Sequence, residues 1–170
     1  MARTEEGKAA TLAERIEYPD PELLRIYGDF AFLVMRSQRQ EAMPMADFRA
    51  AVEPPVTLGQ YRIFRFDEVP RGLITWAMLN REAERKYVTG GTLQLRDWRC
   101  GNRLWLIDLI APYRGLTARM VRWIMQPGNF AKREFFFRRV GGDRQTRRIV
   151  HIDFERAAGK ALILREDAFA

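Results

Sequence analysis

The chain has 170 residues, of which 47% are hydrophobic, and this is enough for one domain with a buried core. Its formal net charge of +7 indicates an acidic partner such as a nucleic acid, an anionic membrane or an acidic protein, although a genomic preference for arginine codons would give the same charge. The single cysteine excludes an internal disulfide, and no apolar run approaches the roughly 20 residues that span a bilayer. We therefore expect a cytoplasmic protein without a membrane span.

Residues 1–18 are polar and lack apolar periodicity, which predicts a flexible N-terminal tail before a single domain over residues 19–170. No apolar stretch follows the charged N-terminus, so a secretory signal is not expected. The domain begins with a helix over 21–36, where apolar residues recur at helical spacing. Asp20 is suited to be its N-cap, and Pro21 occupies the first helical position.

A second helix is expected over 45–52, and the sequence Glu53-Pro54-Pro55 is expected to end it. Alternating apolar and polar residues then predict two strands, at 60–67 and 73–79, which form an antiparallel hairpin. The turn between them is expected at residues 68–72, which include a proline and a glycine.

The second half of the chain continues with both kinds of element. Asn80 is suited to cap a charged helix over 81–88. The remaining expected elements are strands at 103–111, 134–140, 147–154 and 161–165, and a helix at 116–125. This mixture indicates the α/β or α+β class.

One charge stands inside an apolar strand. Six of the seven residues in 104–110 are large and apolar, and Asp108 is the exception. A charge in a buried strand is costly unless it is paired or hydrogen-bonded. Asp108 is therefore a candidate catalytic residue, and a satisfied structural carboxylate is the alternative.

The turn after this strand is a candidate anion site. A helix N-terminus presents free N–H groups and partial positive charge, which suit a phosphate or a developing oxyanion. Arg114 adds positive charge at this turn, and Gly115 lets the backbone approach a ligand. The pattern from Arg114 to Ala118 only faintly resembles the phosphate loop of acetyltransferases.

Other chemistry-bearing residues are few. One histidine and one cysteine, without metal-ligand spacing, argue against a metal site. His151 lies in an alternating stretch and is either a packed strand residue or a base. Four tryptophans either line an acyl-chain groove or pack in the core; they are Trp76, Trp98, Trp105 and Trp123.

Several segments occur in an order known from one protein family. They are Tyr61–Phe66, Val69-Pro70, Leu73–Ala77, Asn80–Val88, Asp97-Trp98, Gly101, Arg103, Trp105–Asp108, Ile110–Pro112 and Phe135–Val140. Together they resemble the toxin-activating lysine acyltransferases, the hemolysin-type activators of RTX protoxins. The resemblance covers about Leu24 to Leu162, and its most specific part is Trp-x-Ile-Asp-x-Ile-Ala-Pro after Asp-Trp.

The resemblance implies a GNAT-like α/β (α+β) acyltransferase fold, with a central mixed, largely antiparallel sheet flanked by helices. It implies an enzyme without a bound cofactor that moves a fatty acyl group from acyl carrier protein to internal lysines of an RTX protoxin in the cytoplasm. The acidic carrier protein and its phosphopantetheine thioester would give the basic surface a partner. The candidate donor-binding residues are Arg103, Arg114, Gly115 and Arg119, with Arg122 beside them.

The resemblance also implies two catalytic positions. The family's aspartate corresponds to Asp108, whereas Gln40 occupies the position of the family's histidine. A neutral glutamine cannot accept a proton and can only position groups by hydrogen bonds. Three interpretations stay open: another group, such as Asp108 or His151, is the base; water takes the proton; or the protein binds its partners without acyl transfer.

Two further hypotheses concern partners. Exposed strand edges leave a homodimer open. A nucleic-acid-binding module is compatible with the charge, but no helix-turn-helix, RNP-like motif or basic run supports it.

Overall fold

The computed structural model describes residues 20–40, 42–141, 146–157 and 159–169, so the tail expected at 1–18 lies outside the described residues. The described part contains the helices α2 (Pro21–Arg36), α3 (Met45–Leu58), α4 (Arg81–Val88) and α5 (Leu116–Ile124). Its strands are β1 (Tyr61–Phe66), β2 (Val69–Leu79), β3 (Arg103–Ile110), β4 (Glu134–Val140), β5 (Thr146–Asp153) and β6 (Ala161–Leu164). Two short 3-10 helices, η1 (Leu95–Asp97) and η2 (Glu166–Phe169), complete the described elements.

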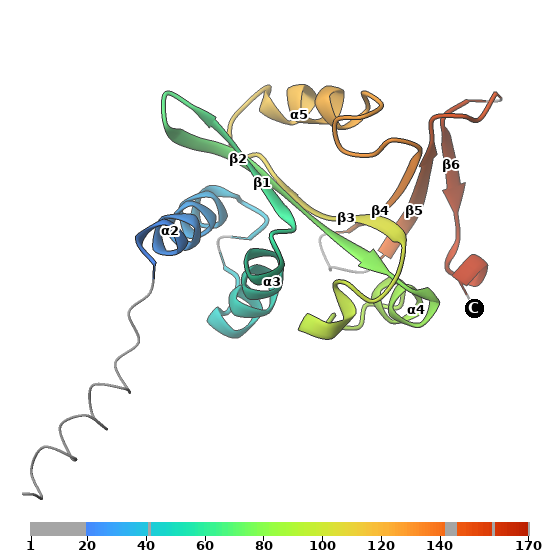
Figure 1. Ribbon diagram of the computed structural model, residues 1–170, viewed down its shortest axis with the longest axis horizontal. Helices are drawn as coiled ribbons and strands as arrows, with labels where there is room; N and C mark the ends of the chain where they lie inside the picture. Colours follow the sequence, from blue (N-terminus) through green and yellow to red (C-terminus); the bar gives the residue numbers. More distant parts are fainter. Residues whose placement is uncertain (1–19, 41, 142–145, 158, 170) are drawn as a thin grey trace, which may run out of the picture.

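The six strands form one sheet in the order β1-β2-β3-β4-β5-β6. All neighbours are antiparallel except β3 and β4, which are parallel and connected through α5. Helix α5 covers one face of the sheet, and α2, α3 and α4 lie on the other (Figure 1). The expected α+β class, with a mixed, largely antiparallel sheet flanked by helices, is therefore confirmed.

Local sequence signals explain where two helices begin. The Asp20 side chain accepts a hydrogen bond from the Glu22 N–H (3.0 Å) at the start of α2. The Asn80 side chain accepts one from the Ala83 N–H (2.9 Å) at the start of α4. Both caps satisfy backbone donors that have no partner within the helix, as the sequence predicted.

Helix α3 is longer than expected. The prediction that Glu53-Pro54-Pro55 ends it was wrong, because the helix continues to Leu58 and ends at Gly59, which has a φ of 64°. A proline inside a helix costs about 3 kcal/mol through its missing N–H and its ring. Pro54 and Pro55 are both buried, together with Val52 and Val56 around them, and this apolar packing offsets the cost.

The β1–β2 turn is shorter than expected. The turn predicted at 68–72 was wrong, because Asp67 and Glu68 alone make the reversal and β2 already begins at Val69. Both residues have positive φ (48° and 62°), the conformation that a two-residue hairpin turn of the matching twist requires. Neither is glycine or asparagine, so the sequence carried no strong signal for this turn.

The core has three clusters, under α4, under α5, and between the sheet and α2 with α3. Trp98 and Trp105 are buried in the α4 cluster, whereas Trp76 and Trp123 pack against the α5 cluster. The core-packing interpretation of the tryptophans is therefore confirmed. Among the described residues, none of the helices has both the length and the apolar character that crossing a membrane requires.

Candidate active site

A bulge in β3 determines where Asp108 points. Thr75 of β2 pairs with Asp108, but the next pair is Trp76 with Leu106, so Ile107 is an extra residue in β3. Leu106 packs against the cluster under α5. Because the bulge interrupts the alternation of side chains, Asp108 points to the opposite face, toward α2 and α3.

Asp108 and Gln40 line the same small cavity. Its volume is about 20 Å³, which is close to the space that a single water or amine needs. The remaining lining residues come from α2, the turn after it, α3, β2 and β3: Phe30, Val34, Met43, Phe48, Ala51, Val52, Leu73, Thr75 and Ile110. The structure therefore brings together the two catalytic positions that the resemblance implied.

Gln40 is held in a tight turn after α2. Its backbone N–H donates to the Ser37 carbonyl (2.9 Å), and its own carbonyl accepts from the Met43 N–H (2.8 Å). The buried Ser37 hydroxyl donates to Gln40 Oε1. Since the amide oxygen is engaged in this way, the Gln40 NH₂ group remains to donate to a ligand in the cavity.

Thr75 is a polar cavity residue that the sequence analysis missed. It is only 1% exposed, and its hydroxyl oxygen accepts a hydrogen bond from the Asp108 N–H (3.2 Å). This bond fixes the backbone of Asp108 where the bulge leaves the regular ladder. A polar residue between Ile74 and Trp76 in an apolar strand was the available signal.

The carboxyl group of Asp108 is in an unusual electrostatic environment. The residue retains some exposed surface, yet protein atoms surround its carboxyl group, and this burial raises the pKa of Asp108 above its usual value. The positive charge of Arg138, on the neighbouring strand β4, acts in the opposite direction and favours the ionised form. A carboxylate with a raised pKa is a stronger base than an ordinary aspartate.

Arg138 was also missed, and the structure shows how it is held. Its guanidinium lies 4.0 Å from the centroid of the Tyr87 ring and donates to the Tyr87 carbonyl (2.8 Å). The Tyr87 hydroxyl in turn donates to the Ile107 carbonyl (3.3 Å), at the bulge. Burial raises the pKa of Tyr87 to about 12, so this hydroxyl keeps its proton. Tyr87 thus contacts both the bulge at Ile107 and Arg138, the cation that acts on Asp108.

The structure does not gather all of the predicted donor-binding residues. Arg103, at the start of β3, is paired with the buried Glu84, and its guanidinium lies 4.4 Å from the centroid of the Phe136 ring. Arg114 and Gly115 follow the opposite end of β3, and a strand of eight residues separates these positions by about 25 Å. Gly115 has a φ of 77° and precedes α5, so a glycine suits this turn.

Arg119 and Arg122 lie exposed on α5, on the face of the sheet opposite the cavity. The donor-binding role of these arginines, and of Gly115, stays a prediction. In the described part of the chain, no three histidine, cysteine, aspartate or glutamate residues lie close enough together to hold a metal ion.

His151 is not part of the cavity. It lies on β5, stacks on Phe136 at 4.2 Å between ring centroids, and its Nε2 is 2.7 Å from Glu134 Oε2. The histidine is thus a packed strand residue with a carboxylate partner, two strands away from β3. The structure places no part of it beside Asp108 or Gln40.

A buried carboxyl group with a raised pKa, beside a held amide, has the chemistry of a general-base site. The model of the RTX toxin acyltransferase family, HlyC, matches residues 21–153. The chain belongs to the RTX toxin acyltransferase family, as the resemblance in the sequence predicted.

Three characterised relatives illustrate the similarity. The protein-lysine myristoyltransferase RtxC of Kingella kingae is 38% identical over 106 residues, which are 61% of this chain and 64% of the relative. The protein-lysine palmitoyltransferase CyaC of Bordetella bronchiseptica is 36% identical over 96 residues (56% and 52%). The protein-lysine myristoyltransferase HlyC of Escherichia coli is 35% identical over 91 residues (53% and 54%). The matches therefore span between about half and two thirds of each relative.

Proposed function

We propose that this chain is a protein-lysine fatty acyltransferase that moves an acyl group from acyl carrier protein to internal lysines of an RTX-type protoxin in the cytoplasm. The observation that carries the proposal is the shared cavity of Asp108 and Gln40. Membership of the family, whose relatives are named as protein-lysine acyltransferases, supports it.

In the proposed reaction, the neutral amine of the target lysine attacks the carbonyl carbon of the thioester. A C–N bond forms, the C–S bond breaks, and the carrier's thiol leaves. The Asp108 carboxylate accepts the proton that the amine must lose, and the departing thiolate takes up that proton. The raised pKa of Asp108 makes its carboxylate a better proton acceptor than that of an ordinary aspartate.

Gln40 takes a role that does not need a proton acceptor. Its Oε1 is engaged by Ser37, so its NH₂ group is directed to donate to the oxyanion that develops on the thioester carbonyl. Removal of a single donor of this kind typically costs about 10²–10³ in rate. In this proposal the glutamine replaces the family's histidine as a positioning and electrostatic group.

The short ladder between β3 and β4 supports an approach of the thioester between the two strands. The two parallel strands pair only through Trp105 with Phe136 and Leu106 with Phe137, and no further pair joins their described residues. Asp108 lies in the part of β3 beyond this short ladder. The acyl donor would thus reach the carboxylate from the gap between the strands.

A homodimer is compatible with the edge strand β6. Leu162 and Ile163 are exposed there (37% and 59%), and an exposed apolar edge strand favours pairing with a second chain. Sedimentation at micromolar concentration would test this part of the proposal.

A second candidate function is a catalytically impaired homologue that binds acyl carrier protein or a protein client without transfer. The observation that favours it is Gln40, which replaces the only proton-accepting side chain that the resemblance places beside Asp108. Gln40→His restores that group. If Asp108 is already the base, this variant should change the transfer rate by no more than about tenfold.

The test is intact-mass detection of acyl addition to an RTX-type acceptor incubated with the chain and acyl-loaded carrier protein. The acyltransferase proposal predicts a mass increase equal to one or more acyl groups, lost in Asp108→Asn. Binding of the carrier without any mass increase, together with a gain of transfer in Gln40→His, would favour the impaired homologue instead.

A further inference from the structure

Three arginines form a row across the ends of β4, β5 and β6. Arg139 on β4 pairs directly with Arg148 on β5. Arg165 follows Leu164, the partner of Ile149 on β5, and therefore comes at the level of Arg148. We name Arg139, Arg148 and Arg165 the arginine row.

The arginine row is electrostatically unfavourable in the chain alone. Like charges directly opposite each other on antiparallel strands are destabilising. In the described part of the chain, none of the three arginines forms an ion pair or side-chain hydrogen bond, and the described residues that line the groove beside the row include one acid, Glu166. An arrangement that costs stability and has no internal counter-charge indicates an anionic partner.

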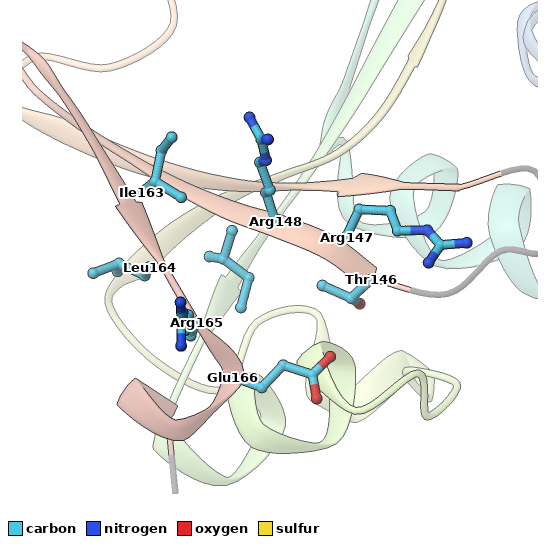
Figure 2. A pocket seen from close by; sticks show the side chains of 8 residues that line it. Thr146, Arg147, Arg148, Ile163, Leu164, Arg165 and Glu166 are labelled. Carbon is cyan, nitrogen blue, oxygen red and sulfur yellow. The ribbon is translucent and has the colours of Figure 1, made fainter.

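Two members of the row, Arg148 and Arg165, line an open groove of about 570 Å³ (Figure 2). Figure 2 shows the side chains of Arg147, Arg148, Arg165 and Glu166 around it. Its apolar lining residues are Ile149, Ile163 and Leu164, of which Ile149 is buried and Ile163 is well exposed (59%). Arginines beside an exposed isoleucine suit a protein surface that combines carboxylates with an apolar side chain.

The groove lies at the same edge of the sheet as the candidate active site. The carboxyl ends of the parallel strands β3 and β4 meet at this edge, where ligands of open sheets with parallel strands bind. Arg39, the residue before Gln40, donates to the Val140 carbonyl at the end of β4 (3.1 Å). The turn that holds Gln40 is thus connected directly to the strand end that carries the row.

The arginine row and Asp108 lie on opposite faces of the sheet, which separates the side suited to the acyl donor from the side suited to the target lysine. Phe137 and Val150 pack toward α5, and Arg139 and Arg148 lie two residues from them along their strands, so both point to the α5 face. Asp108 points to the opposite face. A lysine ammonium would be repelled by the row, whereas a carboxylate-rich protein that bears a phosphodiester would be attracted to it.

We propose that the arginine row and its groove are the docking surface for the acidic acyl carrier protein, in place of the arginines on α5. This inference rests on the proposed function. The carrier docks against β4, β5 and β6 from the α5 side, and its acyl arm enters the gap between β3 and β4.

The test compares two charge-reversal variants of equal net charge, R148E/R165E and R81E/R96E. Arg81 and Arg96 are exposed, and both lie at the opposite end of the sheet, near the start of β3. Transfer is measured with acyl carrier protein and with acyl-pantetheine, a donor that lacks the protein. Binding of unacylated holo-carrier protein is measured separately by fluorescence anisotropy, and circular dichroism checks the fold.

We expect R148E/R165E to raise KM for acyl carrier protein about tenfold, with little change in kcat, because each reversal replaces an attraction with a repulsion. The carrier's Kd should rise by a similar factor and lose most of its salt dependence. Transfer from acyl-pantetheine should be unchanged, and R81E/R96E should behave like the natural chain.

An equal effect of both variants, or a loss confined to R119E/R122E on α5, would overturn the docking surface. Absence of any transfer by the natural chain would instead contradict the proposed function. Because carrier binding is measured without transfer, it still decides the docking surface in that case.

Discussion

Two carboxylates lie within the protein on the same side of the sheet, and their surroundings differ. Glu84 of α4 is completely buried, and its Oε1 accepts hydrogen bonds from Trp105 Nε1 (2.7 Å) and Arg103 Nε. The carboxyl oxygens of Asp108 have no such donors among the described residues, and only the field of Arg138 compensates its charge. Glu84 therefore connects α4 to β3 by hydrogen bonds, whereas the carboxyl group of Asp108 lies at a cavity without a hydrogen-bond donor among the described residues.

This difference separates a structural carboxylate from one that is available for chemistry. A buried charge with direct donors connects the elements that carry it and its partners, and removal of one partner leaves the other uncompensated. A buried carboxyl group without direct donors has a raised pKa and can exchange a proton with a ligand. Substitution of the two residues should therefore affect different properties of the protein.

The largest effect is expected for Asp108→Asn. The transfer rate should fall on the order of 10²–10⁴-fold, because general-base catalysis contributes about that much. The fold favours the protonated form of Asp108, so this residue's contribution to stability is full at low pH and is lost as the pH rises through its raised pKa. Asparagine does not ionise, so the Asp108→Asn variant does not lose this stability as the pH rises. It should therefore unfold at a higher temperature than the natural chain at pH 7.

Thermal unfolding at pH 4 and pH 7, alongside the transfer assay, checks both halves of this expectation. A large loss of transfer accompanied by a large loss of stability would place Asp108 with Glu84 as a structural residue.

Glu84→Gln should have the opposite profile. Removal of this charge leaves Arg103 without its partner and should lower the free energy of unfolding by about 2–4 kcal/mol. Urea unfolding measures the change, and the transfer rate per folded molecule should stay within about twofold of the natural chain. Glu82→Gln is the matched control, since Glu82 is exposed on the same helix and should change stability by less than about 0.5 kcal/mol.

A smaller effect is expected for Arg138→Gln. The positive charge of Arg138 lowers the pKa of Asp108, so its removal should raise that pKa further. Since the reaction requires the ionised carboxylate, activity is lost as the pH falls through this pKa, and the acid limb of the kcat profile should move to higher pH by about 0.5–1 unit.

Arg133→Gln is the control, because Arg133 is exposed and paired with Glu155. An unmoved acid limb in Arg138→Gln would show that the titrating group is not Asp108.

The sequence predicted the elements that depend on local signals. The bounds of α2, α4 and β4 agree with the expectation, because apolar periodicity and the caps Asp20 and Asn80 are local features. Helix α3 continues through its prolines, and the turn at Asp67-Glu68 is tighter than expected, because packing between distant segments determines both.

The candidate site was predictable only in part. Asp108 was visible as a charge in an apolar strand, and Gln40 came from the family resemblance. Thr75 was visible only as a polar residue in an apolar strand, and its place beside Asp108 depends on the pairing of β2 with β3 and on the bulge at Ile107. Arg138 acts on Asp108 from the neighbouring strand β4, which no local pattern reveals. The unpaired row of arginines likewise appears only once β4 and β5 are in register.

The most direct test of the central claim is the titration of Asp108 itself, followed by carbon-13 NMR of its carboxyl group in the natural chain and assigned with Asp108→Asn. The account predicts a pKa above the usual range of aspartate that coincides with the midpoint of the acid limb of the transfer rate. An ordinary aspartate pKa, or a midpoint that does not coincide with it, would contradict the role of Asp108 as the base.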